Sequence, residues 1–155
     1  MKIYTKKGDE GYSDILKKRV RKDDEIFNLV GTIDKLSSSL NFARIEAEKT
    51  EIKEEILKLQ KDLVSLNGFI SGYSSFLCDV SFFEERIDYY TSEAGSFEGF
   101  SFAGTKAGAY IDFARCICRE AERCAVGIDY IDIGVIKYLN RMSDYLYMLS
   151  KYVDM

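Results

Sequence analysis

Residues 50–73 have the sequence TEIKEEILKLQKDLVSLNGFISGY, and this stretch decides the fold. Its apolar residues recur at intervals of four and three, at Ile52, Ile56, Leu59, Leu63, Leu66, Ile70 and Tyr73. On a helix this spacing places them along one narrow face, which is typical of the buried seam of a helical bundle. The stretch therefore predicts a long helix that packs against other helices.

The same periodicity predicts further helices on both sides of this stretch. The first begins at Asp23 and Asp24, whose carboxylates favour the positive end of a helix dipole, and continues to Ala43. The others span about 82–92, 105–128 and 132–153. No strand is expected, and the chain has no proline to interrupt a helix. We therefore expect an all-α protein, an antiparallel four- or five-helix bundle that forms a single domain over residues 1–155.

Composition excludes several classes of function. The 155 residues carry a net charge of −4 and are 46% hydrophobic, which is ordinary for a globular domain. No cationic face is large enough for nucleic acid, and no apolar run is long enough to cross a membrane. The first residues are polar and lack a signal-peptide pattern, so we expect a cytoplasmic protein. Some of the eleven tyrosines are expected to face a partner subunit.

The chain has no histidine and four cysteines. The absence of histidine excludes histidine-based acid–base catalysis and histidine-ligated zinc. The cysteines are Cys78, Cys116, Cys118 and Cys124, and no two of them form a Cys-x-x-Cys pair. We interpret them as reduced core thiols rather than as redox groups or metal ligands, and we predict no metal-binding residue.

Arg115, Arg119 and Arg123 lie four residues apart in the expected helix 105–128, so they share one side of it. Three like charges beside a buried seam need a compensating negative charge. Guanidinium groups bind carboxylates and phosphates equally well in geometric terms. Two interpretations therefore stay open. One is an anionic ligand such as a triphosphate, held together with Glu122, and the other is an ion-pair network with acidic residues of neighbouring helices.

Residues 1–22 are rich in glycine and lysine, and we expect a loop or short extended arm before the helices of residues 23–155. Within this arm, residues 5–13 combine hydroxyl and ammonium groups with glycines, which let backbone amides approach an anion. The composition fits a phosphate cradle, although it lacks the Gly-x-x-x-x-Gly-Lys-Thr pattern of a P-loop. The alternative interpretation is a flexible charged terminus.

Asp34 is a candidate because it adjoins the apolar Ile33 and should be half-buried. A half-buried carboxylate needs a cation, and Arg115 is the natural partner. This pair could serve function or serve structure alone.

Two further places carry candidate residues. Asn140 interrupts the apolar pattern of the last helix, where its amide could bind a base, ribose or phosphate, or else a neighbouring helix. Phe97, Phe100 and Phe102 lie among glycines in an expected loop over residues 93–106. Exposed aromatic residues on such a loop form either a ligand wall or a lid packed on the core.

Taken in order along the chain, five stretches resemble the characteristic motifs of the PduO-type ATP:cob(I)alamin adenosyltransferases. They are residues 4–13 (YTKKGDEGYS), 22–24 (KDD), 31–36 (GTIDKL), 118–123 (CREAER) and 140–144 (NRMSD). Each motif alone is weakly specific, but together they span almost the whole chain. The resemblance implies a five-helix bundle that forms a homotrimer, with active sites between subunits.

The resemblance also implies a reaction and a set of residues. The 5′-deoxyadenosyl group of ATP would pass to cob(I)alamin, giving adenosylcobalamin and triphosphate, with Mg²⁺ as a further counter-charge. The implied ATP-binding residues, from the arm of one subunit and the helices of its neighbour, are Thr5, Lys6, Lys7, Gly8, Ser13, Lys22, Arg119, Glu122, Arg123 and Asn140. The implied catalytic residues are Arg119, Asp34, Arg115 and Phe100. Asp34 and Arg115 would pair near the corrinoid, and Phe100 would displace the lower base from cobalt.

The chain departs from the family pattern at charged positions. Lys35 stands where the pattern has glutamate, Lys7 where it has threonine, and Glu120 where it has the second arginine of Cys-Arg-Arg-Ala-Glu-Arg. A carboxylate that faced the phosphates would weaken ATP binding. Two rivals to an active enzyme therefore stay open: a catalytically impaired paralogue that binds ATP or corrinoid as a sensor or carrier, and a bundle used only for assembly.

Overall fold

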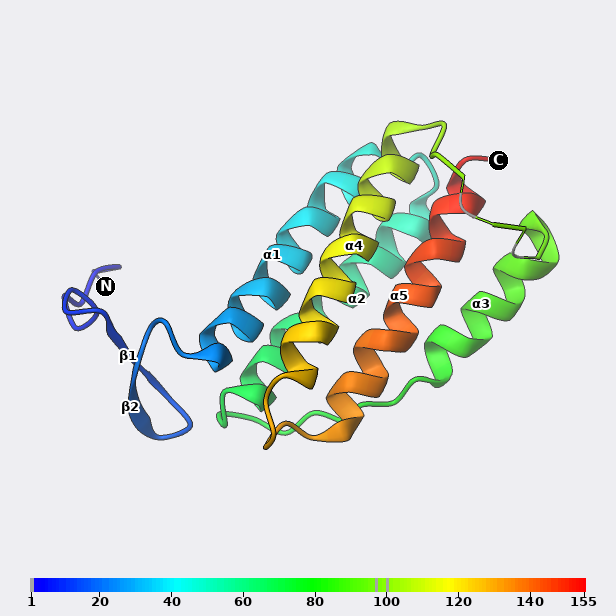
Figure 1. Ribbon diagram of the computed structural model, residues 1–155. Coiled ribbons are helices and arrows are strands. Elements are labelled where there is room, and N and C mark those ends of the chain that lie inside the picture. Colours follow the sequence, from blue (N-terminus) through cyan, green and yellow to red (C-terminus); the bar gives the residue numbers. More distant parts are fainter. Residues whose placement is uncertain (1, 97, 100) are drawn as a thin grey trace.

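The computed structural model describes residues 2–96, 98–99 and 101–155. In this part of the chain five helices follow a short β-hairpin (Figure 1). The helices are α1 (Glu25–Glu46), α2 (Thr50–Ile70), α3 (Ser81–Ala94), α4 (Lys106–Val126) and α5 (Ile133–Val153). The helical bundle expected from the sequence is confirmed.

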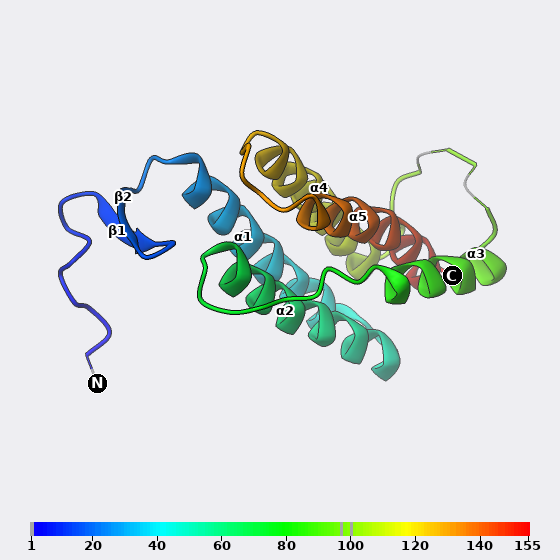
Figure 2. The same ribbon diagram turned by 90° about the horizontal axis from the view of Figure 1, so that it is seen from below.

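The helices pack in a fixed spatial order. α4 packs against α1 on one side and α5 on the other, α2 packs against α1, and α3 packs against α5 (Figures 1 and 2). α1 and α5 run in one direction, α2 and α4 run in the other, and α3 runs parallel to α5 (Figure 1). α3 therefore forms one edge of the bundle, where its inner face and the adjoining helices α4 and α5 can line a groove.

The seam of α2 is buried as its spacing predicts. The seam residues of the helix are at most 5% exposed, namely Ile52, Ile56, Leu59, Leu63, Leu66 and Ile70. The expectation for Tyr73 is wrong, because α2 ends at Ile70 and Tyr73 is 67% exposed. The backbone leaves the helix at Gly72, whose φ of +79° is a conformation that glycine adopts without steric cost. The apolar spacing alone could not reveal this end of the helix.

Side-chain caps fix where three of the helices begin. Asp24, Thr105 and Asp132 each accept a hydrogen bond from a backbone N–H of the first turn of α1, α4 and α5, respectively. Such caps satisfy donors that have no partner within the helix. The cap at Thr105 fixes where α4, the helix that carries the three arginines, begins. Among the described residues, no helix is long and apolar enough to cross a membrane.

The hairpin corrects the expectation that the chain has no strand. β1 (Tyr12–Ile15) pairs antiparallel with β2 (Lys18–Arg21), and Ile15 lies opposite Lys18. The turn residues Leu16 and Lys17 both have positive φ, at 52° and 58°, as a type I′ turn requires. Asn-Gly is the usual signal for this turn, and Leu-Lys gives none. The sequence therefore predicted an arm but not its pairing.

Candidate functional site

Arg119 and Arg123 emerge from α4 with exposed side chains, and neither forms an ion pair with any residue that the structure describes. Arg115 differs from them, because its Nε lies 2.7 Å from Oδ1 of Asp112. Burial lowers the pKa of Arg115, but the hydrogen bond and charge of Asp112 outweigh it and leave that pKa raised. Arg119 and Arg123 are therefore available for an anionic ligand.

A groove of about 410 Å³ opens beside Arg115 and Arg119, between α3, α4 and α5. Its lining residues are Ile87, Thr91, Arg115, Arg119, Ser143, Asp144, Tyr147 and Met148. The volume is within the usual range for small-molecule sites, and the lining combines apolar surface with charge. A slightly larger hollow of about 460 Å³ at another end of the bundle contains none of the candidate residues. We therefore take the groove beside the arginines as the candidate site.

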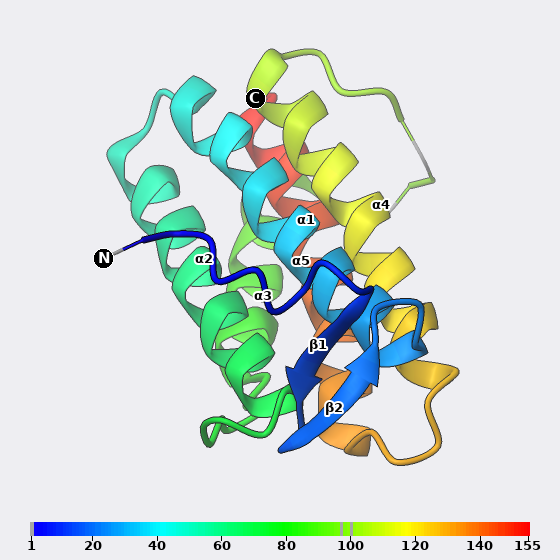
Figure 3. The ribbon, with the colours of Figure 1, turned by 90° about the vertical axis from the view of Figure 1, so that its left-hand side faces the viewer.

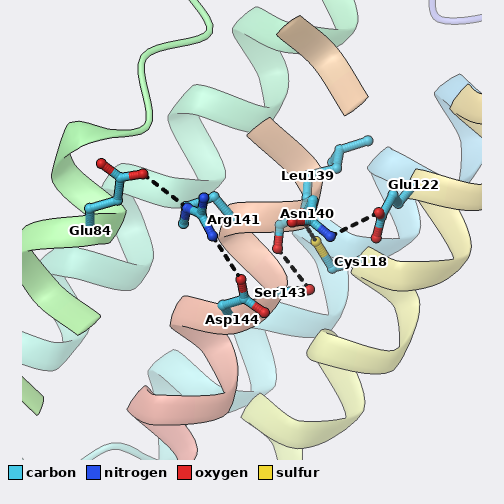
Figure 4. A network of polar contacts seen from close by, with 8 residues as sticks. All are labelled: Glu84, Cys118, Glu122, Leu139, Asn140, Arg141, Ser143 and Asp144. Carbon is cyan, nitrogen blue, oxygen red and sulfur yellow. Dashed lines mark hydrogen bonds and ion pairs between the residues drawn. The ribbon is translucent and has the colours of Figure 1, made fainter. Parts of the chain in front are cut away.

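Asn140 lies across from α4 and is already engaged by it (Figure 4). Its Nδ2 donates to Oε1 of Glu122 at 3.0 Å, and its carbonyl accepts from Ser143 Oγ at 2.8 Å. The neighbouring-helix interpretation of Asn140 therefore holds for its amide nitrogen in this subunit. The contact also places Asn140 beside Glu122, the residue that directly precedes Arg123 on α4.

The two charge-reversing departures from the family pattern form one contact. Lys35 Nζ on α1 lies 2.7 Å from Oε2 of Glu120 on α4. The pattern has glutamate and arginine at these two positions, so the chain carries the same kind of pair with its charges exchanged. Glu120 therefore has a cationic partner on α1.

Asp34 is not half-buried, because its side chain is exposed on α1 between the core residues Ile33 and Leu36. Neighbouring positions on a helix are rotated by about 100°, so adjacency to a core residue does not imply burial. Within the described chain Asp34 forms no ion pair with Arg115, which is held by Asp112 instead. A contact between these two residues would have to come from different subunits.

The arm holds its own candidate residues in a defined arrangement. Lys22 Nζ donates to the carbonyl of Gly8 at 3.0 Å, and Arg19 donates to the carbonyl of Lys7. A Cβ at Gly8 would lie 2.7 Å from Lys22 Nζ, so a larger residue at this position would displace the lysine ammonium group. Thr5 Oγ1 accepts a hydrogen bond from the backbone N–H of Lys7.

The structure separates the arm from the arginines of α4. The hairpin and the arm project from one side of the bundle (Figures 1 and 3). Among the described residues, none of the hydrogen bonds made by Thr5, Lys6, Lys7, Gly8, Ser13 and Lys22 reaches α4. One subunit therefore does not bring the two sets of cations together.

Two further sequence expectations concern aromatic residues and cysteines. Phe97 and Phe100 lie outside the described residues, and Phe102 is fully exposed. The expectation of core thiols holds for Cys118, since burial is the main cause that raises its pKa, but Cys116 is exposed. No group of three or more potential metal ligands occurs in the described part of the chain.

Sequence reasoning missed several residues that line the groove. Ile87 and Thr91 come from α3, and Tyr147 comes from α5, where its hydroxyl donates to the carbonyl of Gly99 at 2.8 Å. Tyr147 follows Ser143 by one helical turn, so the motif at residues 140–144 could have pointed to it. The α3 residues gave no such signal, because their role depends on how α3 packs.

The groove is lined by Arg119, which has no ion pair within the described part of the chain, and the arm is rich in glycine and lysine; both features suit a helical-bundle protein to an anionic ligand. The family model described as cobalamin adenosyltransferase matches residues 3–153. The chain therefore belongs to the cobalamin adenosyltransferase family, and its activity is that of an ATP:corrinoid adenosyltransferase.

Similar proteins agree with this assignment. The human corrinoid adenosyltransferase MMAB is 36% identical over 99% of this chain and 69% of its own length. A corrinoid adenosyltransferase of Bacillus subtilis is 34% identical over 99% of this chain and 87% of its own. A variant PduO-type ATP:corrinoid adenosyltransferase from Lactobacillus reuteri, solved in complex with cobalamin and ATP, has a TM-score of 0.91 at 26% identity. That match covers 99% of this chain and 93% of the other.

Proposed function

We propose that the protein transfers the 5′-deoxyadenosyl group of ATP to cob(I)alamin at sites formed between subunits of a homotrimer. The arm of one subunit and the arginine side of α4 of its neighbour bind the ATP. The observation that carries this proposal is that Arg119 and Arg123 are exposed and have no ion pair within the described chain. The plain assembly bundle, which requires internally satisfied arginines, is disfavoured by the same observation.

The triphosphate has the most contacts in this proposal. Arg119 and Arg123 bind phosphate oxygens, Glu122 orients them from α4, and Asn140 acts from α5 through its contact with Glu122. From the neighbouring subunit, Thr5, Lys6, Lys7, Gly8, Ser13 and Lys22 complete the phosphate cradle. The geometry supports this assignment because Gly8 and Lys22 already lie in contact in the arm.

The reaction suits a site without histidine. The cobalt(I) centre of the substrate attacks C5′ of the ribose and forms a Co–C bond. The C5′–O bond breaks, and triphosphate leaves with the bonding electron pair. No proton has to move in this step, so no general base is required. The protein contributes alignment of the two substrates and positive charge where negative charge develops on the leaving group.

The corrinoid occupies the groove beside Arg115 and Arg119 in this proposal. In this proposal Asp34 of one subunit pairs with Arg115 of the next, since Asp34 is exposed on α1 and Arg115 lines the groove. Phe100, whose position the structure does not describe, serves to displace the lower base of the corrinoid. Gly99 accepts a hydrogen bond from Tyr147, which lines the groove.

Mg²⁺ enters the proposal together with ATP. The described residues offer no cluster of three carboxylate, cysteine or histidine ligands, so they fit a cation that arrives on the triphosphate rather than one held by the protein. Mg²⁺ usually keeps several waters and binds through phosphates and one or two carboxylates. Glu122 is the carboxylate of this site that could contribute. The bound ion would supply further charge neutralisation of the leaving group.

The trimer is supported by apolar surface on the two helices that carry the site. Phe42 and Ile45 on α1 and Phe113 on α4 are each more than half exposed. Phe42 stacks against Tyr110 at 5.4 Å between ring centroids, so the exposed rings of α1 and α4 adjoin one another. Exposed aromatic residues of this kind are typical of subunit interfaces. The cytoplasmic location expected from the sequence stays a prediction.

The test combines turnover with binding. Purified protein is mixed anaerobically with ATP, Mg²⁺ and chemically reduced cobalamin, and the corrinoid absorbance is followed. We expect adenosylcobalamin to form, and Arg119→Ala to lower kcat/KM by at least about a hundred-fold because it removes charge from the leaving group. Arg21→Ala is the matched control, since Arg21, at the end of β2, already pairs with Asp23 in the link to α1. ATP binding without turnover would instead support the sensor or carrier.

A further inference from the structure

The turn of the hairpin is strained and lies against the edge of the core. Leu16 and Lys17 both adopt positive φ, which costs energy for residues other than glycine, asparagine or aspartate. Ile15, just before the turn, is 2% exposed, and Leu16 packs against the hydrophobic core. Strain of this kind persists where the surrounding structure compensates for it. The contacts of Leu16 identify what compensates here.

Leu16 is fixed to the segment that follows α2. Its backbone N–H donates to the carbonyl of Ser71 at 3.0 Å. Its side chain lies against Gly72, where a Cβ would be 3.1 Å from Leu16 Cδ2. One residue further along, Tyr73 donates its hydroxyl hydrogen to the carbonyl of Asp14 at 3.0 Å. The end of β1 and the first residue of the turn are thus tied to three consecutive residues after α2, Ser71, Gly72 and Tyr73.

The opposite end of the hairpin carries the arm. The backbone N–H of Lys22 donates to Gly11 at 2.8 Å, and Lys22 Nζ donates to Gly8 at 3.0 Å. Figures 1 and 3 show that at this end β2 continues into α1 and the amino-terminal segment leaves β1, whereas the turn lies at the other end of the hairpin, beside the segment that follows α2. Because two paired strands are stiff compared with a loop, the link to α1 and the contacts of the turn together fix the direction of the hairpin and of the arm.

We propose that Leu16, Gly72 and Tyr73 form a latch that sets the direction of the hairpin and thereby positions the ATP-binding arm over the neighbouring subunit. This inference rests on the proposed function of the arm. Leu16, Gly72 and Tyr73 are positioning residues, because they act through the hairpin and do not touch the nucleotide. The strained Leu-Lys turn persists because the Leu16 side chain packs into the space beside Gly72, which we call the notch.

The test uses two substitutions that relieve the same strain. Asparagine tolerates positive φ, so Leu16→Asn and Lys17→Asn both relax the turn. Only Leu16→Asn removes the side chain that fills the notch, since Lys17 is exposed. We expect Leu16→Asn to raise KM for ATP by about ten-fold, with kcat at saturating ATP and KM for the corrinoid within about two-fold of wild type. Lys17→Asn should leave all three within about two-fold.

A conservative variant and a direct structural readout complete the experiment. Leu16→Met keeps an apolar, adaptable side chain in the notch and should retain the wild-type KM for ATP. Amide hydrogen exchange should become faster in the hairpin of Leu16→Asn while exchange in the five helices stays unchanged. A purely structural role for Leu16 would lower the Tm without changing the ratio of the two KM values.

Two outcomes would overturn the latch, and they can be told apart. In the first outcome, Lys22→Ala raises KM for ATP, but the KM for ATP of Leu16→Asn equals that of Lys17→Asn. The arm then binds ATP, and the latch is wrong. In the second outcome, Lys22→Ala and Lys6→Ala both leave KM for ATP unchanged. The arm then does not bind ATP, and its proposed function fails together with the latch.

Discussion

Lys35 and Glu120 illustrate how single residues can mislead when they are considered separately. Each appears to reverse a charge that the nucleotide site needs, but the structure joins them at 2.7 Å between α1 and α4. Their side chains are 50% and 44% exposed, so the pair contributes little to stability, about 1 kcal/mol or less. We expect the pair to affect ATP binding, because it keeps the Glu120 carboxylate away from the phosphates bound by Arg119 and Arg123.

This residue pair gives a first prediction. Lys35→Glu should raise KM for ATP by about ten-fold, because the unpaired Glu120 and the new carboxylate repel the triphosphate. The double variant Lys35→Glu/Glu120→Arg restores a pair of opposite charges and should bring KM back to within about two-fold of wild type. Steady-state kinetics with varied ATP would test this. Additive effects of the two substitutions would show that the residues act independently.

The candidate site could be predicted from sequence only for residues that carry recognisable chemistry. The spacing of Arg115, Arg119 and Arg123 pointed to a cationic side of α4, and the structure places Arg115 and Arg119 at a groove. The spacing could not show that Arg115 would pair with Asp112, while Arg119 and Arg123 have no ion pair among the described residues. That outcome depends on local side-chain geometry, which periodicity does not contain.

At the scale of elements, α3 is the helix whose attachment matters most for the groove. Two of its residues, Arg86 and Tyr90, contact Glu55 of α2. Glu55 accepts hydrogen bonds from Tyr90 and from Tyr145 of α5, both at 2.8 Å, and pairs with Arg86 at 2.5 Å. The Arg86 guanidinium also lies 4.7 Å from the ring centroid of Tyr90. One carboxylate therefore joins α2, α3 and α5 behind the groove wall.

This network predicts a specific loss of stability. Glu55→Gln removes the charge that pairs with Arg86 and leaves fewer acceptors for three donors. We expect the free energy of unfolding to fall by about 2–4 kcal/mol, because a largely buried charge loses its partner. Urea unfolding would measure it. The neighbouring exposed residue provides the control, since Glu54→Gln should change stability by less than about 0.5 kcal/mol. Equal effects would contradict the account.

The elements themselves differed in how far they could be predicted. The helices follow from apolar spacing and capping residues, because both signals are local in sequence. The hairpin was missed because its turn residues, Leu16 and Lys17, are poor formers of the turn they adopt. Tertiary contacts with Ser71 and Gly72 select that turn, and such contacts are not visible in a single sequence.

At the scale of the whole molecule, buried tyrosines make stability depend on pH. Burial raises the pKa of Tyr145 well above its ordinary value, and the charge of Glu55 adds to this shift. Burial also raises the pKa of Tyr90 and Tyr138. A folded-state pKa above that of the unfolded chain means that the stabilisation is complete below the unfolded value, about 10, and is lost as the pH rises above it.

We therefore expect the free energy of unfolding to decrease above about pH 10, with each such tyrosine contributing a slope of at most about 1.4 kcal/mol per pH unit. Tyr145→Phe should be less stable than wild type near neutral pH but should show a shallower decrease. Urea unfolding between about pH 8 and about pH 11 would test this. A variant with the same slope as wild type would show that Tyr145 ionises as freely in the folded state as in the unfolded state.

The central claim is that each active site combines the arm of one subunit with α4 of the next, and subunit complementation tests it most directly. Lys22→Ala disables the arm, and Arg119→Ala disables α4, so each variant alone should be nearly inactive. In trimers assembled from equal amounts of both, a quarter of the sites join an intact arm to an intact α4. The account predicts recovery of about a quarter of wild-type activity. A mixture no more active than its two parents would contradict it.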